Sequence, residues 1–225
     1  MDEESKELVK ATAEGVAAGA TSQFLDKLLG PVVEGGEMLR DRVRLRRWKA
    51  EVKMLAKAQA FLDDRGIDPS RVPAKILFPL LDYASLEDEE DEVMLDRWAA
   101  LLANAAAGTE RGVTVLPSFP RILSELSPEE AAILDELYRE PDPQRVPSLY
   151  SYHVSELQLE HESDPLFYTR CFNLDRLGLL EASWQNVRIT ASPPVYQHRV
   201  ARLEGTALGL SFVLACSPPS EGSLP

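Results

Sequence analysis

The sequence predicts a mainly α-helical protein in two parts: an N-terminal helical module with one long helix, and a smaller C-terminal α+β module. Three observations support this division. Through the first half, apolar residues recur every three or four positions, the period of a helix face. The loop-like stretch "GTERGVTVLP" follows, and "SPEEAAILDELYRE" after it opens with a complete helix-start signal. Later, two strand-like segments flank the turn residues "ASPP", as in a β-hairpin.

The first half is predicted to contain four helices. The first spans Glu4 to Leu29, and Gly30-Pro31 interrupts its apolar stripe. The second and longest spans about Pro31 to Arg65 and ends at Gly66, a suitable left-handed terminator. Its coiled-coil-like seam would consist of Leu45, Trp48, Val52, Leu55, Gln59 and Leu62.

The third and fourth helices lie in "PAKILFPLLDYAS" and "SLEDEEDEVMLDRWAALLANAAAG". Pro79 inside the third predicts a kink. In the fourth, Ser85 and Asp88 have the spacing of a capping box, and the acids that follow would occupy the first turns, where the helix dipole favours them. Its inner face would be formed by Met94, Leu95, Trp98, Leu101, Leu102 and Ala105.

The second module begins at Ser127, the expected cap of a helix with Pro128 first and Glu130 as the reciprocal capping acid. A weak helix near "SYHVSELQLEHE", a helix from Asp164 to Gly178, the hairpin "LLEASWQNVRIT"/"VYQHRVARLE" and a short helix in "TALGLSFVLAC" follow. This order is that of a winged helix-turn-helix. We therefore expect a helical module over 1–110, a connecting loop and short helix over 111–126, a winged-helix-like module over 127–216 and a disordered tail over 217–225.

Several blocks also resemble a known family. "LLGPVVEGGEMLRDRVRLRR", "ILFPLLDYASLEDEEDEVMLDRWAALLANAAAG" and "PSFPRILSELSPEEAAIL" are similar to the Abi-alpha (abortive infection alpha) family over about residues 28–134. "LDRLGLLE" and "LEGTALGLSF" resemble the recognition-helix end and the closing helix of a winged helix, within 127–216. The family resemblance implies a bacterial protein associated with phage defence, and it carries over no catalytic or binding residues.

Composition and motifs argue against an enzyme. The formal net charge of -13 is unsuited to a surface devoted to DNA or anionic lipid, and no run of 18 apolar residues suggests a membrane span. The acidic N-terminus lacks the apolar core of a signal peptide, so we expect a cytoplasmic protein with two free thiols. The three histidines have no metal-ligand spacing, and no phosphate-binding or nucleophile motif occurs. No cofactor or metal is therefore expected.

Two runs of opposite charge are the main candidate interaction sites. The basic helix face would consist of Arg40, Arg42, Arg44, Arg46, Arg47, Lys49 and Lys53, with Lys57 beyond it. The acidic helix would present Glu87, Asp88, Glu89, Glu90, Asp91 and Glu92. We favour pairing between them, within one subunit or between subunits, over phosphate binding or a solvated face.

The second module has residue types suited to nucleic acid, but its net charge is unfavourable. The candidate contacts are Arg170, Asn173, Arg176, Arg188, Arg199 and Arg202. Seven basic and thirteen acidic residues between Ser127 and Cys216 leave a net charge of -6, which favours protein recognition over DNA binding.

The sequence thus predicts a non-catalytic interaction or sensing component of phage defence. It would form a homo-oligomer through the helical module and bind a protein partner through the second module. The first alternative is a DNA-binding winged-helix regulator. The second is a membrane-acting effector, which the polar N-terminal helix makes the less favoured of the two.

Overall fold

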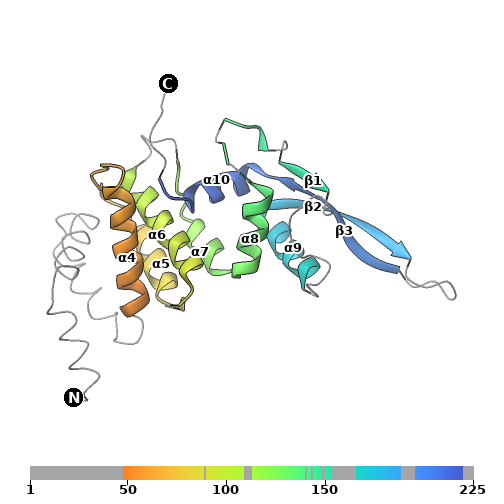
Figure 1. Cartoon of the computed structure of the whole chain (residues 1–225), viewed down its shortest axis with the longest axis horizontal. Coiled ribbons are helices and arrows are strands. Elements are labelled where there is room, and N and C mark those ends of the chain that lie inside the picture. The colour runs from red at the N-terminus through yellow and green to blue at the C-terminus, as the bar shows by residue number, and fades with distance from the viewer. Residues whose placement is uncertain are drawn as a thin grey trace, which may run out of the picture. The chain divides into compact units, whose positions relative to one another are not determined.

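The computed structural model describes residues 48–88, 90–108, 113–139, 141–142, 144–147, 150–153, 166–188 and 196–219 (Figure 1). They fall into two compact units, divided between Ser124 and Glu125 and again between Leu214 and Ala215. The described chain is mainly helical and carries a three-stranded antiparallel sheet. The predicted fold class is confirmed at that level. In the described part of the chain, no helix is long and apolar enough to cross a membrane.

The first unit is a helical bundle. Its described helices are α4 (Trp48–Asp63), α5 (Ala74–Ala84), α6 (Glu92–Ala107) and α7 (Phe119–Ser124). Helix α4 packs along α6, and α5 packs against both α6 and α7. Helix α6 is buried on nearly every side, as expected for a central helix with alanines between its large apolar residues. Of the predicted inner face, all but the half-buried Ala105 are buried.

The long helix differs in part from its predicted seam. Residues before Trp48 lie outside the described residues, and α4 ends at Asp63, three residues before Gly66 with its φ of 60°. Gly66 is therefore confirmed as a left-handed residue after the helix. The buried stripe of α4 consists of Ala50, Glu51, Met54, Leu55, Ala58 and Leu62. Val52 and Gln59 are only half-buried, because α6 and α5 cover a face rotated from the narrow coiled-coil seam.

The capping box predicted at Ser85 is wrong. Ser85 ends α5, and its hydroxyl donates to the backbone carbonyl of Asp82 (2.7 Å). The N-cap of α6 is Asp91, whose carboxylate accepts from the backbone N–H of Met94 (3.0 Å). Glu87, Asp88 and Glu90 lie between α5 and α6, and the Ser85 hydroxyl is bonded to the preceding helix and not to the next one.

The second unit combines helices with the sheet. Its described elements are α8 (Pro128–Leu137), β1 (Ser151–His153), α9 (Phe167–Arg176), β2 (Leu180–Arg188), β3 (Tyr196–Gly205) and α10 (Ala207–Ala215), of which Ala215 belongs to the first unit. The capping box of α8 is confirmed: the N–H of Glu130 donates to Ser127 Oγ (3.2 Å), and the N–H of Ser127 donates to the Glu130 carboxylate (2.7 Å).

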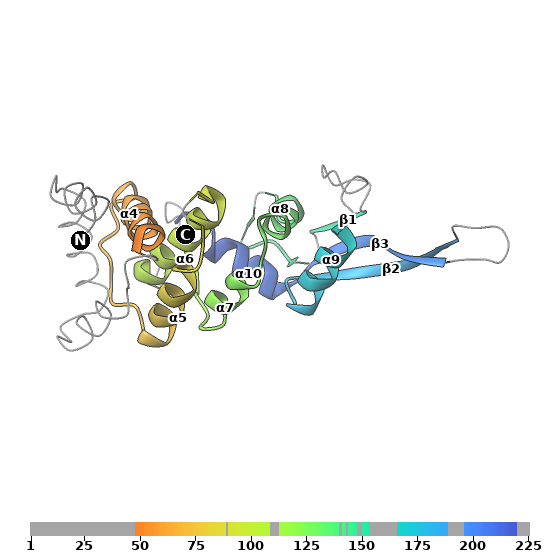
Figure 2. The same ribbon diagram turned by 90° about the horizontal axis from the view of Figure 1, so that it is seen from below.

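The sheet has the order β1-β3-β2, with β3 between its two antiparallel neighbours (Figure 2). The predicted hairpin is therefore confirmed. Trp184 pairs with Val200 and Ser183 with Arg202, so Ala201 is an extra residue that forms a β-bulge in β3. The weak helix predicted near "SYHV" is wrong at its start. Residues 151–153 instead pair with β3, an interaction between distant segments that local propensity does not reveal. Residues 154–165 lie outside the described residues.

A buried tyrosine joins three segments of this unit. The hydroxyl of Tyr138 donates to the carbonyl of Leu179 (2.6 Å) and accepts from the N–H of Thr206 (2.8 Å). Gly209 lies so close that a Cβ there would stand 1.9 Å from the Leu179 oxygen. Only glycine fits this approach, so α10 is held tightly against the start of β2.

Candidate functional site

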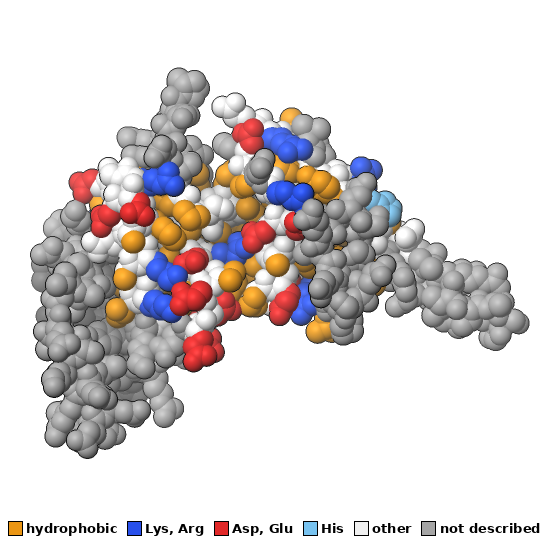
Figure 3. Space-filling model, viewed as in Figure 1, with side chains coloured by type: hydrophobic (Ala, Val, Ile, Leu, Met, Phe, Trp, Pro, Cys, Tyr) orange, Lys and Arg blue, Asp and Glu red, His pale blue; other side chains and the backbone are white. Residues whose placement is uncertain are grey.

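The charged face of the first unit is a set of ion pairs within one chain. Lys53 pairs with Glu92, and Lys57 pairs with Asp96 and with Glu92 (Nζ to Oε2, 2.8 Å). Basic and acidic side chains lie side by side on this part of the molecule in Figure 3. Hydrogen bonds from Lys53 and Lys57 lower the pKa of Glu92 to about 2. Partial burial acts to lower the pKa of Lys57, but hydrogen bonds to Asp96 and Glu92 outweigh it and raise that pKa.

These pairs join α4 to α6. Lys53 and Lys57 already contact carboxylates, so they are not unpaired cations that could bind a phosphate. Glu92 and Asp96 are each about half exposed (55% and 51%), so the pairs orient the helices more than they stabilise them. The predicted basic residues Arg40, Arg42, Arg44, Arg46 and Arg47 lie outside the described residues, as does the side chain of Lys49.

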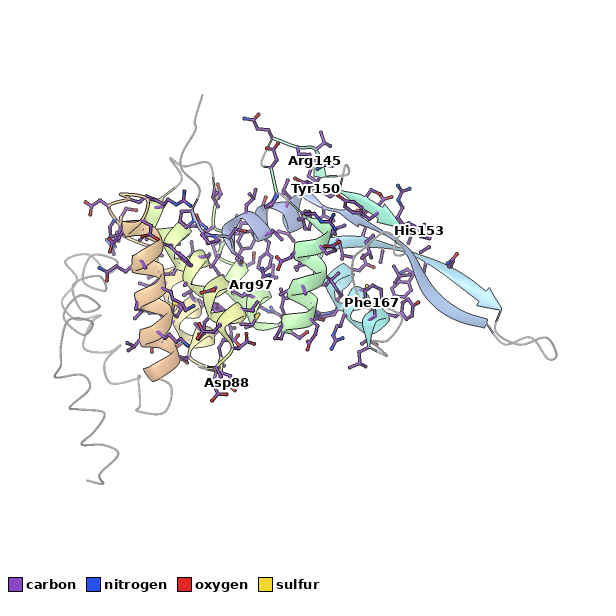
Figure 4. All side chains as sticks on the ribbon, viewed as in Figure 1. Asp88, Arg97, Arg145, Tyr150, His153 and Phe167 are labelled. Carbon is purple, nitrogen blue, oxygen red and sulfur yellow. The ribbon has the colours of Figure 1, made fainter. Side chains whose placement is uncertain are left out.

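The predicted acidic residues serve the local structure around the α5–α6 turn. Glu87 accepts a hydrogen bond from the indole of Trp98 (2.8 Å), and burial raises the pKa of this carboxyl. Asp88 points into solvent and accepts from the N–H of Glu90 (3.1 Å) (Figure 4). Glu89 lies outside the described residues. Among the residues that the structure describes, no group of His, Cys, Asp and Glu could hold a metal ion.

A carboxyl of α4 is buried without a described cation beside it. Glu51 is 5% exposed, and burial, aided by the negative charge of Asp82, raises its pKa to about 7. Its position next to the buried Met54 and Leu55 stripe could have been recognised only from the packing of α4 against its neighbours.

The polar side of α9 faces acids of its own unit. Arg170 pairs with Glu129 (3.5 Å), the Asn173 amide donates to Glu130 (2.8 Å), and Arg176 pairs with Glu125 (2.7 Å). These are three of the six predicted nucleic-acid contacts. Of the other three, Arg202 is 3.6 Å from Glu204, and the side chains of Arg188 and Arg199 lie outside the described residues.

An exposed aromatic pair lies beside this polar network. Phe172 of α9 is 59% exposed, Trp184 of β2 is 38% exposed, and their ring centroids are 6.5 Å apart in an edge-to-face arrangement. Neither residue is among the contacts predicted from the sequence. A signal was present for Phe172, because it falls outside the buried α9 stripe of Phe167 (labelled in Figure 4), Cys171 and Leu174.

A family model described as abortive infection alpha matches residues 46–216, which include both units. The chain belongs to the abortive infection alpha family. No curated protein and no solved structure matches it.

The family match covers a different part of this abortive infection alpha protein from the sequence blocks quoted above. It starts at residue 46, beside the start of α4, and ends one residue after α10, whereas the blocks indicated about 28–134. The charged face, the α9 network and the aromatic pair all belong to the family region. Arg40, Arg42 and Arg44 precede it.

Proposed function

We propose that this protein is a non-catalytic protein-interaction component of phage defence, and that it recognises another protein through the unit Glu125–Leu214. Membership of the abortive infection alpha family supports the defence context. One observation carries the choice of a protein partner over a nucleic acid. The polar side chains of α9 already contact Glu125, Glu129 and Glu130.

The arrangement of the unit supports a winged-helix reading. Helix α8, strand β1, helix α9 and the β2–β3 hairpin occur in that order, and β1 pairs with β3, which pairs with β2. In such a unit α9 takes the place of the recognition helix and the hairpin that of the wing. A DNA-binding recognition helix presents cations and amides to phosphates and base edges.

Helix α9 offers a different surface. Its cations are neutralised by carboxylates, and its exposed apolar residue Phe172 contacts Trp184. Aromatic residues with neighbouring arginines are the residue types that contribute most of the binding energy in protein interfaces. The geometry therefore supports protein recognition better than DNA binding, in agreement with the net charge of this unit.

Self-association through the helical module is also part of the proposal. Lys53 and Lys57 form their ion pairs within one chain. A contribution of the basic run to self-association would therefore come from residues 40–47. Reversal of Arg44, Arg46 and Arg47 to Glu should then shift the oligomeric mass. An unchanged mass would remove the basic run from the proposal. We further propose a cytoplasmic location and no enzymatic activity.

The partner class is tested by fluorescence anisotropy with a labelled duplex of about 30 base pairs, titrated with salt. A winged helix with a basic face binds duplex non-specifically with a Kd of roughly 1–100 µM at physiological salt. We expect no binding of the full chain in that range. Micromolar binding with a steep salt dependence would overturn the proposal in favour of a DNA-binding regulator.

The role of the aromatic surface is tested by phage plating on cells that express the full chain. Phe172→Ser should lose protection, whereas the control Thr169→Ser, on the same exposed side of α9, should retain it. Both variants should keep the wild-type circular dichroism. Full protection by Phe172→Ser would show that this surface is not used.

A further inference from the structure

We propose that the partner at the aromatic surface is a second copy of this chain, joined by antiparallel pairing of the two β2 strands about a two-fold axis at Trp184. This inference rests on the proposed function, since it names the partner of the same surface. Three observations support it. Strand β2 is at the edge of the described sheet, the backbone groups on its outer edge are regularly spaced, and Trp184 is its central residue.

Strand β2 is an edge strand of the described sheet, because β3 lies on one side of it and no described strand on the other. It spans nine residues, "LEASWQNVR", with charges only at Glu181 and Arg188 and with no proline, lysine or glycine. Proteins usually protect a long edge strand with such residues or with a bulge, since the unpaired backbone groups otherwise attract another strand. The sequence of β2 has little of that protection.

The bulge of this hairpin leaves the outer edge intact. The extra residue, Ala201, is in β3, so β2 itself keeps a regular spacing of backbone groups. The bulge also keeps Val200 opposite Trp184, with Val200 buried and Trp184 partly exposed. The partly exposed indole of Trp184 therefore lies on a strand whose outer backbone groups are regularly spaced.

Trp184 is the fifth of the nine residues, the centre of the strand. Antiparallel pairing of two identical strands about this residue is isologous, since each copy presents the same groups to the other. Trp184 would face Trp184 of the second copy, with Cβ atoms about 5 Å apart, and each Phe172 would flank the pair on the same face of a continuous sheet. Such aromatic cross-strand pairs stabilise sheets.

The same register avoids repulsion between two chains that each carry a net charge of -13. Ser183 faces Gln185 of the second copy, Glu181 faces position 187 and Leu180 faces position 188, so no carboxylate is placed opposite another carboxylate. Arg176 and Arg170 beside the surface are already neutralised by Glu125 and Glu129. A neutral, apolar region is where two strongly acidic chains can approach most closely.

Sedimentation velocity of the full chain tests the dimer, with charge reversal as its specific probe. Ser183 and Gln185 are exposed, and they pair with Arg202 and Arg199 of the same chain, so circular dichroism of each variant must first show that the hairpin is kept. Ser183→Lys/Gln185→Lys places lysines opposite lysines, and Ser183→Glu/Gln185→Glu places acids opposite acids. We expect a wild-type mass of twice 25.0 kDa, dissociation constants raised at least about tenfold in each variant, and recovery when the two variants are mixed.

Two further arms make the outcome decisive. Lysines added at the exposed Ala132 and Ser211, in the same unit but outside β2, should leave the dimer unchanged. A mixture of Ser183→Cys and Gln185→Cys chains should form a disulfide-linked dimer, because the two introduced cysteines face each other in the proposed register. Neither chain should form this dimer alone, because its introduced cysteine does not face its own copy and the native cysteines are buried.

A wild-type monomer at about 100 µM, or variants that dimerise like the wild type without recovery on mixing, would overturn the β2 dimer. Recognition of another protein through Phe172 would still stand if Phe172→Ser lost protection in the plating assay, whereas a wild-type monomer would also remove self-association through the helical module. A dimer with the predicted charge behaviour, combined with full protection by Phe172→Ser, would instead confirm the pairing and overturn the proposed function.

Discussion

Glu51 provides the sharpest test of the packing of the first unit. This carboxyl is 5% exposed on the inner side of α4, and burial, with the charge of Asp82 as a second cause, raises its pKa from 4.5 to about 7. Glu51→Gln keeps the shape of the side chain and removes its ionisation. The variant therefore isolates the free energy that the folded protein loses by holding this charge away from water.

The magnitude follows from the two pKa values. Between pH 4.5 and about 7, the folded protein keeps a proton on Glu51 that the unfolded chain has released, so stability falls as the pH rises. At about 1.4 kcal/mol per pH unit, the loss reaches about 3 kcal/mol and is constant above that range. Glu51→Gln should thus be more stable than the wild type by up to about 3 kcal/mol at pH 8, and the difference should shrink towards pH 5.

Urea unfolding at pH 5, 6, 7 and 8, followed by circular dichroism and tryptophan fluorescence, measures this difference. Glu92→Gln is the control. The pKa of Glu92 is lowered, so its stabilising effect is present above pH 4.5 and is lost as the pH falls towards 2. It should therefore contribute no pH dependence between 5 and 8. Parallel pH profiles of the wild type and Glu51→Gln over that range would refute the reasoning.

Three substitutions test the hydrogen bonds that hold the elements together, each by urea unfolding. Tyr138→Phe leaves the Leu179 carbonyl and the Thr206 N–H without this partner and should cost about 1–3 kcal/mol. Asn104→Ala removes a buried amide that donates to the carbonyls of residues 215 (2.9 Å) and 217 (2.8 Å), and should cost a similar amount. Ser127→Ala removes the cap of α8 and should cost about 1 kcal/mol, whereas Ser127→Asp should cost less.

The sequence predicted most accurately those features that depend on a few neighbouring residues. The capping box of Ser127 and Glu130, the left-handed Gly66 and the β2–β3 hairpin were all recognised from short patterns. In each case one local interaction dominates, so no distant segment can change the outcome.

The errors arose where a residue had two available partners. Ser85 had the spacing to cap α6, but its hydroxyl bonds the end of α5. Residues 151–153 had a weak helical pattern, but they pair with β3. Each choice is decided by a contact between segments far apart in the chain.

The candidate site also depends on contacts between distant segments that the sequence does not reveal. Counting charges over 127–216 indicated an acidic module, but it did not say which acids meet which cations. The structure shows that Glu130 both completes the capping box of α8 and accepts from Asn173 of α9, while its neighbour Glu129 pairs with Arg170. The acids that start one helix therefore also occupy the polar side of the next. Neutralising Glu130 to free Asn173 for a nucleic acid would also weaken the capping box of α8, and this coupling favours an aromatic, protein-directed surface in this unit.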